Sequence, residues 1–424
     1  MSLAPKPAPA TCGCDTAASH RPLISLGDAL AILRRKVRAV SGVQDLPLAD
    51  ARGRVLGEDI HTQESLPRFD NAAMDGFAVK FSDIGESGVT RLAISQRIAA
   101  GEAATQRLAP NTCARIFTGA PLPDGADTVI AQEEVRWREG VATFAAPRVR
   151  GRNLRCKGGD MPKGTLALEK GQRLDMAALG LAAALGRWAL PVRRQIRVAI
   201  LRSGDEIVAP GQPLAAGQIY DVNGTLLRAA LQPAGADICS DISCPDDAGA
   251  TKRLLRELAL KHDLILTTGG ISVGGKDHVL EAFGAAGGQL GFAGVALKPG
   301  KPVAFGTIGR ACFLGLPGNP LACLAGWVLF GAPLMVRLSG ASERARKRYV
   351  TLAKPLSHKP GRRELRLAQL GPAPTGGLEV ASPVMSASSA HLGALRQADG
   401  FVVLPENIQS FAAGTPLEFI SLTL

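Results

Sequence analysis

The sequence predicts a multidomain fold in which an α/β domain is combined with β-rich parts on both sides of it. The chain has 424 residues, which is too long for one ordinary hydrophobic core. From Arg197 to Leu314, short buried β runs are separated by helical stretches, a pattern typical of a parallel sheet covered by helices. Residues 45–150 and the chain after residue 337 contain short β runs broken by Gly, Pro and Asp, which indicates β-rich domains.

The composition is that of a soluble globular protein, with 46% hydrophobic and 20% charged residues. The net charge of +12 favours anionic partners. Aromatic residues make up only 4%, and no basic run is interleaved with Tyr or Phe, so nucleic-acid binding is not expected. Eight scattered cysteines are typical of reduced thiols in the cytosol, and apolar neighbours favour burial of Cys113, Cys312 and Cys323.

Two segments of the sequence indicate where in the cell the protein is located. Residues 1–22 resemble a flexible leader and lack the apolar core of a signal peptide. The stretch from Ala311 to Val336 carries no charge, but Gly318 and three prolines interrupt it, so a buried helix is favoured over a membrane span. The sequence therefore predicts a cytoplasmic protein without membrane contact.

Helical spacing of apolar residues occurs in two places before residue 195. Residues 26–37 have this spacing and follow Ser25, which is a suitable N-cap. Residues 164–190 predict a second helix, with Met176 and Ala184 on its apolar face.

Glycine-containing loops follow three of the β runs in the α/β part, at residues 203–206, 269–272 and 317–320. Loops at the carboxyl ends of parallel strands form ligand sites in such folds. In TTGGISVGGKD (residues 267–277), glycines without Cβ atoms would let backbone N–H groups approach an anion, and Asp277 could hold a bridging cation. Tight packing of the loop is an equally good explanation of the glycines.

Lysines and acids occur near the same loops. LKPGKP places Lys298 and Lys301 on a stretch stiffened by proline, which can present charge to oxyanions, although a solvated turn explains it too. Carboxylates beside phosphate-binding loops favour Mg2+, whereas any single acid can be a helix cap or a surface charge. The acids are Asp205, Glu206, Asp246, Asp247 and Asp277.

Three motifs of the first β-rich part combine Arg with turn-forming acids: FDNAAMDGFA behind Arg68, RIFTGAP from Arg115, and GRNLRCKGGD from Gly151. Arg suits bidentate binding of phosphate, but ion pairs within the fold are an alternative of equal weight. Asp70 and Asn71 also suit a simple Asx turn.

Taken together and in this order, these motifs closely resemble the molybdopterin molybdenumtransferase family, which includes bacterial MoeA and the E domain of gephyrin. The resemblance covers residues 23–424 and also includes SGDEI, QIYDVN, TTGGISVGGKD, LKPGKP and LPGNP. It implies a three-layer α/β domain with a β-rich lid, a helical stalk and a C-terminal β-barrel, assembled as a homodimer. The corresponding boundaries are 1–22 for the leader, 23–55 and 150–192 for the stalk, 56–149 for the lid, 193–337 for the α/β domain and 338–424 for the barrel.

The resemblance further implies that the protein inserts molybdate into adenylylated molybdopterin, with Mg2+-dependent release of AMP. The metal ligands carried over by motif are Asp205, Glu206, Asp246 and Asp277. The catalytic residues would be Asp277, Glu206, Asp246, Lys298, Asp75 and Asp160, with Asp75, Thr118 and Asp160 supplied by the partner subunit. The substrate-binding residues would be Thr118, Ser203, Gly204, Asp205, Gly269, Gly270, Ser272, Lys298, Pro299, Lys301, Arg363 and Ser389.

Three positions depart from the family pattern. Ala322 stands where a Ser is common, Gly159 replaces a Glu before Asp160, and Ala387-Ser388-Ser389 replaces Gln-Gly-Ser. A specialised or nonenzymatic paralogue that binds molybdopterin as a scaffold therefore stays open as an alternative. The adenylyltransferase that precedes the family in the pathway is a second rival, but it resembles only residues 195–335. That adenylyltransferase and acceptor molybdoenzymes or chaperones are also the expected partners.

Overall fold

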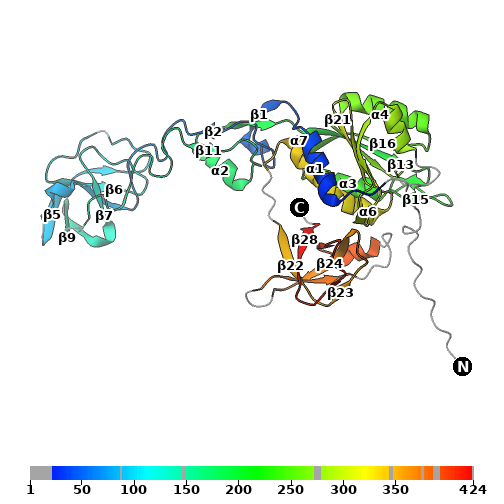
Figure 1. The fold of residues 1–424 in the computed structure, drawn as a ribbon. Coiled ribbons are helices and arrows are strands. Elements are labelled where there is room, and N and C mark those ends of the chain that lie inside the picture. The colour runs from blue at the N-terminus through cyan, green and yellow to red at the C-terminus, as the bar shows by residue number, and fades with distance from the viewer. Residues whose placement is uncertain are drawn as a thin grey trace. The chain divides into compact units, whose positions relative to one another are not determined.

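The computed structural model describes residues 22–85, 88–104, 106–145, 149–271, 278–342, 347–373, 377–384 and 392–422. The chain divides into two compact units (Figure 1). The large unit comprises Met1–Gly57, Gly171–Asp175 and Pro191–Leu424, and the small unit comprises Glu58–Lys170 and Met176–Leu190. All but residue 22 of the leader proposed from the sequence lies outside the described residues.

The small unit is built on a six-stranded sheet in the order β7-β4-β6-β5-β9-β8. Its strands are β4 (Gly76–Val79), β5 (Val89–Ile98), β6 (Thr112–Ile116), β7 (Thr128–Ala131), β8 (Val135–Arg138) and β9 (Val141–Ala145). Side chains alternate between two cores, because Phe77 and Val79 belong to one apolar cluster and Ala78 to another. The sheet therefore has an apolar layer on each face. Shorter elements are η3 (Phe81–Asp83), η4 (Gln132–Glu134) and the strand pairs β2 (Ile60–His61) with β11 (Leu166–Leu168) and β3 (Asn71–Ala72) with β10 (Leu154–Arg155).

The helix predicted over residues 164–190 is wrong at both ends. Only α2 (Met176–Ala184) is helical, between β11 and β12 (Ala189–Arg193). Gly171 and Gly186 interrupt it, since both adopt positive φ, which a helix does not contain. The buried face is also different, because α2 buries Ala178 and Ala182 while Met176 is 83% exposed.

The α/β part of the large unit contains a six-stranded sheet in the order β16-β13-β17-β21-β20-β18. Its strands are β13 (Ile196–Ser203), β16 (Ala236–Cys244), β17 (Leu264–Thr268), β18 (Gln289–Ala293), β20 (Ala304–Ile308) and β21 (Ala311–Leu316). The first four strands in that order are parallel, β20 runs antiparallel to β21, and β18 runs antiparallel to β20 and so in the direction of the first four. The carboxyl ends of these four parallel strands therefore lie at the same end of the sheet.

Helices cover both faces of this sheet (Figure 1). Leu264 and Leu266 of β17 pack in a cluster with α1, α3, α6 and α7, whereas Ile265 between them packs in a second cluster with α4 and α5. The three-layer α/β fold expected from the sequence is therefore confirmed. The helical elements are α1 (Leu26–Lys36), α3 (Asn223–Leu231), α4 (Ala248–Lys261), α5 (Val279–Ala285), α6 (Pro320–Gly326), the π-helical turn η5 (Trp327–Gly331) and α7 (Ala332–Ser339).

The predicted first helix is confirmed as α1, and the Ser25 side chain accepts the N–H of Asp28 at 3.0 Å as its N-cap. Small elements complete this part of the large unit: β1 (Val43–Pro47), which pairs with β12, η2 (Leu48–Asp50), and β14 (Ile207–Val208), which pairs with β15 (Ile219–Tyr220).

The C-terminal part of the large unit is a closed barrel. Strands pair in the order β24-β25-β22-β28-β26, and β26 pairs back with β24. Its strands are β22 (Arg348–Leu352), β24 (Arg363–Gly371), β25 (Val380–Pro383), β26 (Gly400–Leu404) and β28 (Pro416–Ser421), with β23 (Leu356–Ser357), β27 (Ser410–Phe411) and η6 (Leu392–Gln397) beside them. The expected barrel is confirmed, and β19 (Leu297–Lys298) of the α/β part pairs with β24.

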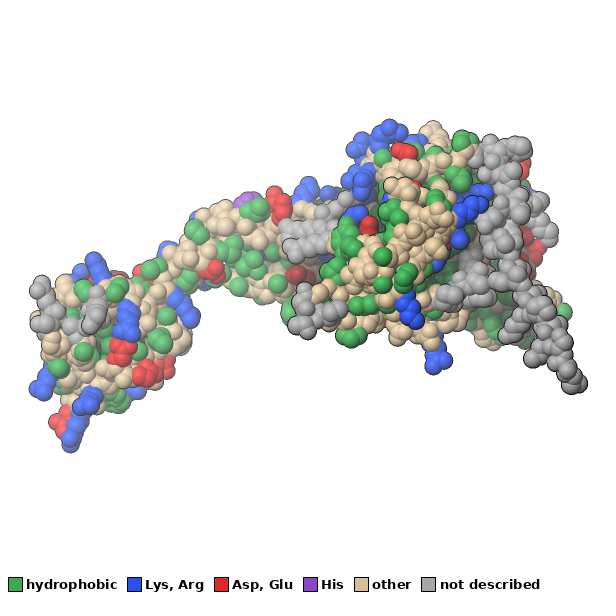
Figure 2. Space-filling model, turned by 60° about the horizontal axis from the view of Figure 1, so that its bottom comes forward, with side chains coloured by type: hydrophobic (Ala, Val, Ile, Leu, Met, Phe, Trp, Pro, Cys, Tyr) green, Lys and Arg blue, Asp and Glu red, His purple; other side chains and the backbone are tan. Residues whose placement is uncertain are grey.

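Predictions about burial are also confirmed. Among the described residues, Pro320–Ser339 is the one helix long and apolar enough to cross a membrane, and 72% of its apolar window is buried inside the protein. Cys113, Cys312 and Cys323 are buried, and burial raises the pKa of each thiol to about 12. Figure 2 shows Lys and Arg side chains in several separate places on both units, among hydrophobic and other side chains.

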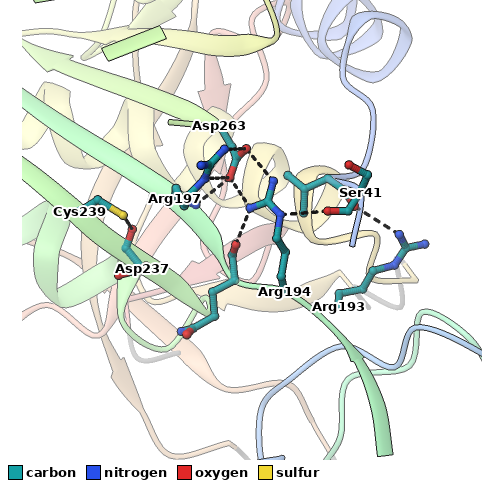
Figure 3. Close-up of polar contacts among 9 residues, drawn as sticks. Ser41, Arg193, Arg194, Arg197, Asp237, Cys239 and Asp263 are labelled. Carbon is teal, nitrogen blue, oxygen red and sulfur yellow. Dashed lines mark hydrogen bonds and ion pairs between the residues drawn. The ribbon is translucent and has the colours of Figure 1, made fainter. Parts of the chain in front are cut away.

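Asp263 precedes β17 and joins it to the segment before β13 (Figure 3). Its carboxylate accepts two hydrogen bonds from the Arg194 guanidinium, at 2.7 and 2.8 Å, and one from the Arg197 N–H at 2.9 Å. Burial would raise the pKa of this carboxyl, but the hydrogen bonds from Arg194 and Arg197 outweigh it and lower that pKa to about 2.

We expect Asp263→Asn to lower the free energy of unfolding by about 2 kcal/mol at pH 7. The folded pKa lies below the ordinary value of 3.8, so the stabilisation is present above pH 4 and is lost as the pH falls towards 2. Urea unfolding should show that the difference in the free energy of unfolding between variant and wild type is smaller at pH 3 than at pH 7. Asp237→Asn on neighbouring β16 is the control, and equal stability of both variants at pH 7 would contradict this role.

Candidate functional site

Three loops leave the parallel sheet at one edge. β13, β17 and β21 lie side by side and parallel, with Arg202 opposite Thr268 and Thr268 opposite Leu316. The loops that follow these residues therefore begin at the same level. They are the glycine-containing loops at 203–206, 269–272 and 317–320, whose common position the sequence predicts.

The glycines let these loops pack closely. Gly269 has a φ of 84°, and a Cβ added there would lie 2.8 Å from the Ser203 carbonyl oxygen. A Cβ on Gly318 would lie 3.5 Å from the Gly269 Cα. The Gly269 N–H donates to the Leu316 carbonyl at 3.1 Å, so this amide is already engaged. Packing between loops thus explains Gly269, the alternative left open by the sequence.

Carboxylates gather at the end of β13. The Ser203 hydroxyl donates to Asp246 Oδ1 at 2.9 Å, and the Asp246 N–H lies 3.5 Å from Asp205 Oδ1. The Glu206 carboxylate folds back over Gly204, where an added Cβ would lie 2.9 Å from both of its oxygens. Three of the four acids predicted to bind Mg2+ are therefore brought to one strand end.

The neighbouring Asp247 has a different task. Its side chain accepts the Ala250 N–H at 2.6 Å and caps the N-terminus of α4. Helix capping is therefore enough to explain an acid at position 247, and no bound ligand is needed.

A complete metal site is not defined by the part of the chain that the structure describes. Within that part, no group of three or more His, Cys, Asp or Glu side chains is arranged to hold a metal ion. Asp277 and Ser272 lie outside the described residues. The four-carboxylate set therefore stays a prediction.

Asn223 at the start of α3 joins the same edge, although sequence reasoning did not assign it a role. Its Nδ2 donates to the Gly318 carbonyl at 2.7 Å, and its Oδ1 is buried without a hydrogen-bond partner among the described residues. Asp221, only 3% exposed, accepts the Gly224 N–H at 2.8 Å and lies 3.5 Å from Arg202. Both residues belong to the QIYDVN motif, which is the sequence feature that could have indicated their place at this site.

Lys298 lies at the junction between the α/β part and the barrel. β19 runs parallel to β24, which places Lys298 opposite Glu364 and Leu297 opposite Arg363. Lys298 Nζ is 3.4 Å from Glu364 Oε2, and its side chain is 48% exposed. The ammonium group is therefore oriented by a carboxylate while part of it stays accessible to a ligand.

Glu364 is the centre of this junction, although sequence reasoning missed it. It is 5% exposed and contacts Arg366 at 2.6 Å and His358 Nδ1 at 3.5 Å in addition to Lys298. His358 Nε2 lies 2.6 Å from the Ile408 carbonyl, so this nitrogen carries a proton and donates it. No local motif could reveal a contact between Lys298 and a residue 66 positions away.

The other residues predicted to bind molybdate differ in their burial and in their hydrogen-bond partners. Pro299 is half-buried next to Lys298. The Arg363 guanidinium makes two hydrogen bonds to Glu406, at 2.8 and 3.2 Å, so its charge already has a counterion. Lys301 is also half-buried, and Ser389 lies outside the described residues.

Asp75, Thr118 and Asp160 belong to the small unit. Asp75 Oδ1 accepts both the N–H and the hydroxyl of Thr118, each at 2.8 Å. The backbone hydrogen bond, then the hydroxyl bond and the charge of Arg115, hold the Asp75 pKa below its usual value. Asp160 is exposed on a different turn, where its N–H donates to the Leu66 carbonyl at 3.1 Å.

Comparison with known proteins identifies the family. Residues 24–186 match the MoeA N-terminal region (domain I and II), residues 199–337 a probable molybdopterin binding domain, and residues 349–422 the MoeA C-terminal region (domain IV). Molybdopterin molybdenumtransferase 2 of Mycobacterium tuberculosis (strain ATCC 25618 / H37Rv) is 37% identical over 389 residues, which cover 89% of this chain and 95% of that relative. The chain belongs to the MoeA family of molybdopterin molybdenumtransferases.

Further relatives agree with this assignment. Molybdopterin molybdenumtransferase of Haemophilus influenzae is 37% identical over 302 residues, covering 70% of this chain and 73% of the relative. The crystal structure of a molybdopterin biosynthesis MoeA protein from Pyrococcus horikoshii has a TM-score of 0.80 and 30% identity, and covers 94% of this chain and 99% of its own. The MoeA resemblance, the fold class and the assignment to transferases of molybdenum cofactor biosynthesis are thus confirmed.

Two departures from the MoeA pattern lie in the described part of the chain. Ala322 is 5% exposed in α6 and offers no hydrogen-bonding side chain at the position where the family resemblance leads us to expect Ser. Gly159 is exposed, and its N–H donates to the Cys156 carbonyl at 2.9 Å in the turn before Asp160. Neither position therefore offers a polar side chain to a ligand.

Proposed function

We propose that this MoeA-family chain inserts molybdate into adenylylated molybdopterin, with Mg2+-dependent release of AMP, to form the molybdenum cofactor. The observation that carries the proposal is the gathering of Asp205, Glu206 and Asp246 with three glycine-containing loops at one sheet edge. A multiply anionic substrate can bind beside carboxylates only when a cation lies between them.

The carboxylate oxygens at the end of β13 are the donor type that Mg2+ prefers. Asp205, Glu206 and Asp246, with Asp277, would hold the ion, which when bound would polarise the phosphoanhydride for attack by water. The Ser203 hydroxyl orients Asp246 through the 2.9 Å hydrogen bond. Ser203, Gly204, Gly269, Gly270 and Ser272 would line the nucleotide phosphates.

Molybdate would bind near Lys298, Pro299, Lys301, Arg363 and Ser389. An ammonium group has three donors, and Lys298 directs only one towards Glu364, so others stay available for an oxyanion. Arg363 is held by two hydrogen bonds to Glu406, whereas Lys298 makes one longer contact with Glu364, so we assign the main electrostatic attraction to Lys298.

We further propose a cytoplasmic homodimer in which Asp75, Thr118 and Asp160 of one subunit close the pocket of the other. Thr118 holds Asp75 in its ionised form, as a group that positions a cationic or hydrogen-bonding part of the substrate must be. A molybdopterin adenylyltransferase would supply the substrate, and molybdoenzymes or their chaperones would accept the product.

The function is tested by incubating the purified full-length protein with adenylylated molybdopterin, molybdate and Mg2+. We expect stoichiometric release of AMP and formation of molybdenum cofactor. Absence of both products would refute the proposed enzymatic activity. It would favour a scaffold that binds molybdopterin, the alternative supported by Ala322 and Gly159. Formation of the adenylate from ATP and molybdopterin would instead assign the adenylyltransferase reaction.

We expect Glu364→Gln to raise the KM for molybdate about tenfold with a smaller effect on kcat. The neutral amide no longer fixes Lys298, whose Nζ lies 3.4 Å from the carboxylate. Steady-state AMP release at varied molybdate measures this effect. Glu418→Gln, which breaks the exposed 2.9 Å ion pair with Lys347 in the same barrel, is the matched control. Equal KM values for the two variants would argue against Glu364 as a positioning residue.

A further inference from the structure

Two arginines and two aromatic residues form one stack on the small unit. The Arg97 guanidinium carbon lies 4.7 Å from the centre of the Phe117 ring, and that of Arg115 lies 5.5 Å from the same centre. Arg115 also lies over the Trp137 ring, at 4.4 Å from its centre. These are cation–π distances, so the two rings hold the two guanidinium groups in place. We call these four residues the arginine–aromatic stack.

The six-stranded sheet brings the two arginines together. Arg97 of β5 and Arg115 of β6 are direct partners in the parallel pairing of these strands, so their side chains leave the same face of the sheet. Like charges at opposed positions repel each other. The Phe117 ring, which follows β6, offsets this repulsion by attracting both cations.

Neither guanidinium group of the stack has an ion pair or a hydrogen bond within the part of the chain that the structure describes. The ion pairs of the small unit in that part belong to other cations, namely Arg68, Lys80, Arg138, Arg150 and Arg152. A guanidinium group stacked on a ring uses its flat face, whereas its N–H donors point outward in the plane of the group. Because Arg97 is exposed and Arg115 is half-buried, these donors can serve a ligand.

The aromatic side of the stack is also accessible. Trp137 is 50% exposed, and Phe117 is half-buried. A single exposed aromatic residue needs no explanation, but this one is held beside two cations that no carboxylate of the described residues neutralises. The exposed part of the indole ring can stack against a second flat ring.

The stack adjoins residues that we propose to close the substrate pocket. Phe117 directly precedes Thr118, whose N–H and hydroxyl both donate to Asp75 Oδ1 at 2.8 Å. The charge of Arg115 helps to lower the pKa of Asp75. A substrate that contacts Asp75 and Thr118 therefore also meets the stack.

We propose that the arginine–aromatic stack binds a flat heteroaromatic ring that carries a phosphate group. The ring stacks on Trp137, and Arg97 and Arg115 bind the phosphate through paired hydrogen bonds. Both halves of adenylylated molybdopterin have this chemistry, because each joins a heteroaromatic ring to a phosphate group. The inference rests on the proposed function, which supplies such a ligand, and it makes the stack a specificity-determining part of the lid.

The test is a titration of tryptophan fluorescence in the full-length protein. The chain has three tryptophans and Trp327 is 3% exposed, so a Trp188→Phe background leaves Trp137 as the exposed reporter. The probes are 5′-AMP and, separately, molybdopterin under anaerobic conditions, each without Mg2+ or molybdate and with correction for absorption by the probe. We expect saturable quenching by at least one probe. The probe that quenches identifies the half of the substrate that the stack binds.

Arg97→Gln in this background should weaken the binding about tenfold, because a charged partner of the phosphate is lost. Arg91→Gln is the matched control, since Arg91 is an exposed arginine of the same strand outside the stack, and it should bind as the background does. If Arg97→Gln does not fold, Arg97→Lys replaces it. Lysine keeps the charge but cannot form the paired hydrogen bonds, so binding should weaken here too.

No saturable quenching by either probe overturns the inference, as does equal affinity of the position-97 variant and Arg91→Gln. The outcome is separate from that of the reaction. Quenching that depends on Arg97, together with no AMP release in the turnover assay, would refute only the proposed reaction. Normal AMP release without quenching of Trp137 would refute only the role of the stack.

Discussion

Asp246→Ala is expected to reduce Mg2+-dependent AMP release at least about 100-fold while changing the free energy of unfolding by less than about 1 kcal/mol. The carboxylate accepts the Ser203 hydroxyl at 2.9 Å and lies beside Asp205 and Glu206 at the end of β13. Without bound metal the substitution removes one part-buried hydrogen bond between side chains, which contributes about 1 kcal/mol or less. With metal, the same removal deletes a ligand.

Asp247→Ala provides the matched control, because it removes the adjacent carboxylate with the opposite expected result. Asp247 caps α4 through the 2.6 Å bond from the Ala250 N–H, and losing such a cap costs about 1 kcal/mol. AMP release should stay near the wild-type rate. Both variants are measured by AMP release at saturating Mg2+ and by urea unfolding. Equal loss of activity in the two would mean that damage to the loop, and not loss of a ligand, explains the effect.

The sequence predicted the central strands of the α/β sheet well because burial on both faces produces continuous apolar runs. β17 (Leu264–Thr268) and β21 (Ala311–Leu316) are buried throughout, and their loops were correctly placed at one edge. β16 was not predicted, although it has nine residues. It is an edge strand whose ADICSDISC sequence mixes polar and apolar residues, so it lacks the continuous apolar run that marks the central strands.

Local pattern also could not distinguish neighbouring acids. Asp246 and Asp247 are identical in type and adjacent, yet one faces Ser203 and the other caps a helix. The difference depends on backbone direction at the start of α4, which only the fold defines. Glu364 was missed for a related reason, since its partner Lys298 reaches it only through the pairing of β19 with β24.

The helix predicted at 164–190 shows how composition can mislead. Ala- and Leu-rich sequence has high helix propensity, and the stretch satisfies the spacing over much of its length. Gly171 and Gly186, both with positive φ, confine the helix to Met176–Ala184 and allow β11 and β12 to form on either side.

Gly76→Ala is expected to destabilise the small unit by about 3 kcal/mol or more. Gly76 is buried in β4 between β6 and β7, opposite Ile116 and Ala131. A Cβ at this position would lie 2.0 Å from the Ile130 carbonyl oxygen and 2.9 Å from the Ile130 carbonyl carbon. Both are backbone atoms of the adjacent strand, so the clash cannot be relieved by rotating a side chain. The β4–β7 ladder must separate instead.

Hydrogen–deuterium exchange of the full-length protein measures the stability of the small unit and of the large unit separately. Amides of β4 and β7 should exchange faster in Gly76→Ala, whereas those of β13 and β17 in the large unit should stay protected. Gly180→Ala is the control in the same unit, because Gly180 lies within α2 and a Cβ there would meet no atom within 4 Å. That variant should be more stable by about 0.5–1 kcal/mol, as expected for Ala in a helix interior. Unchanged exchange in β4 and β7 would mean that Gly76 does not lie against Ile130, and the register of this sheet would have to be revised.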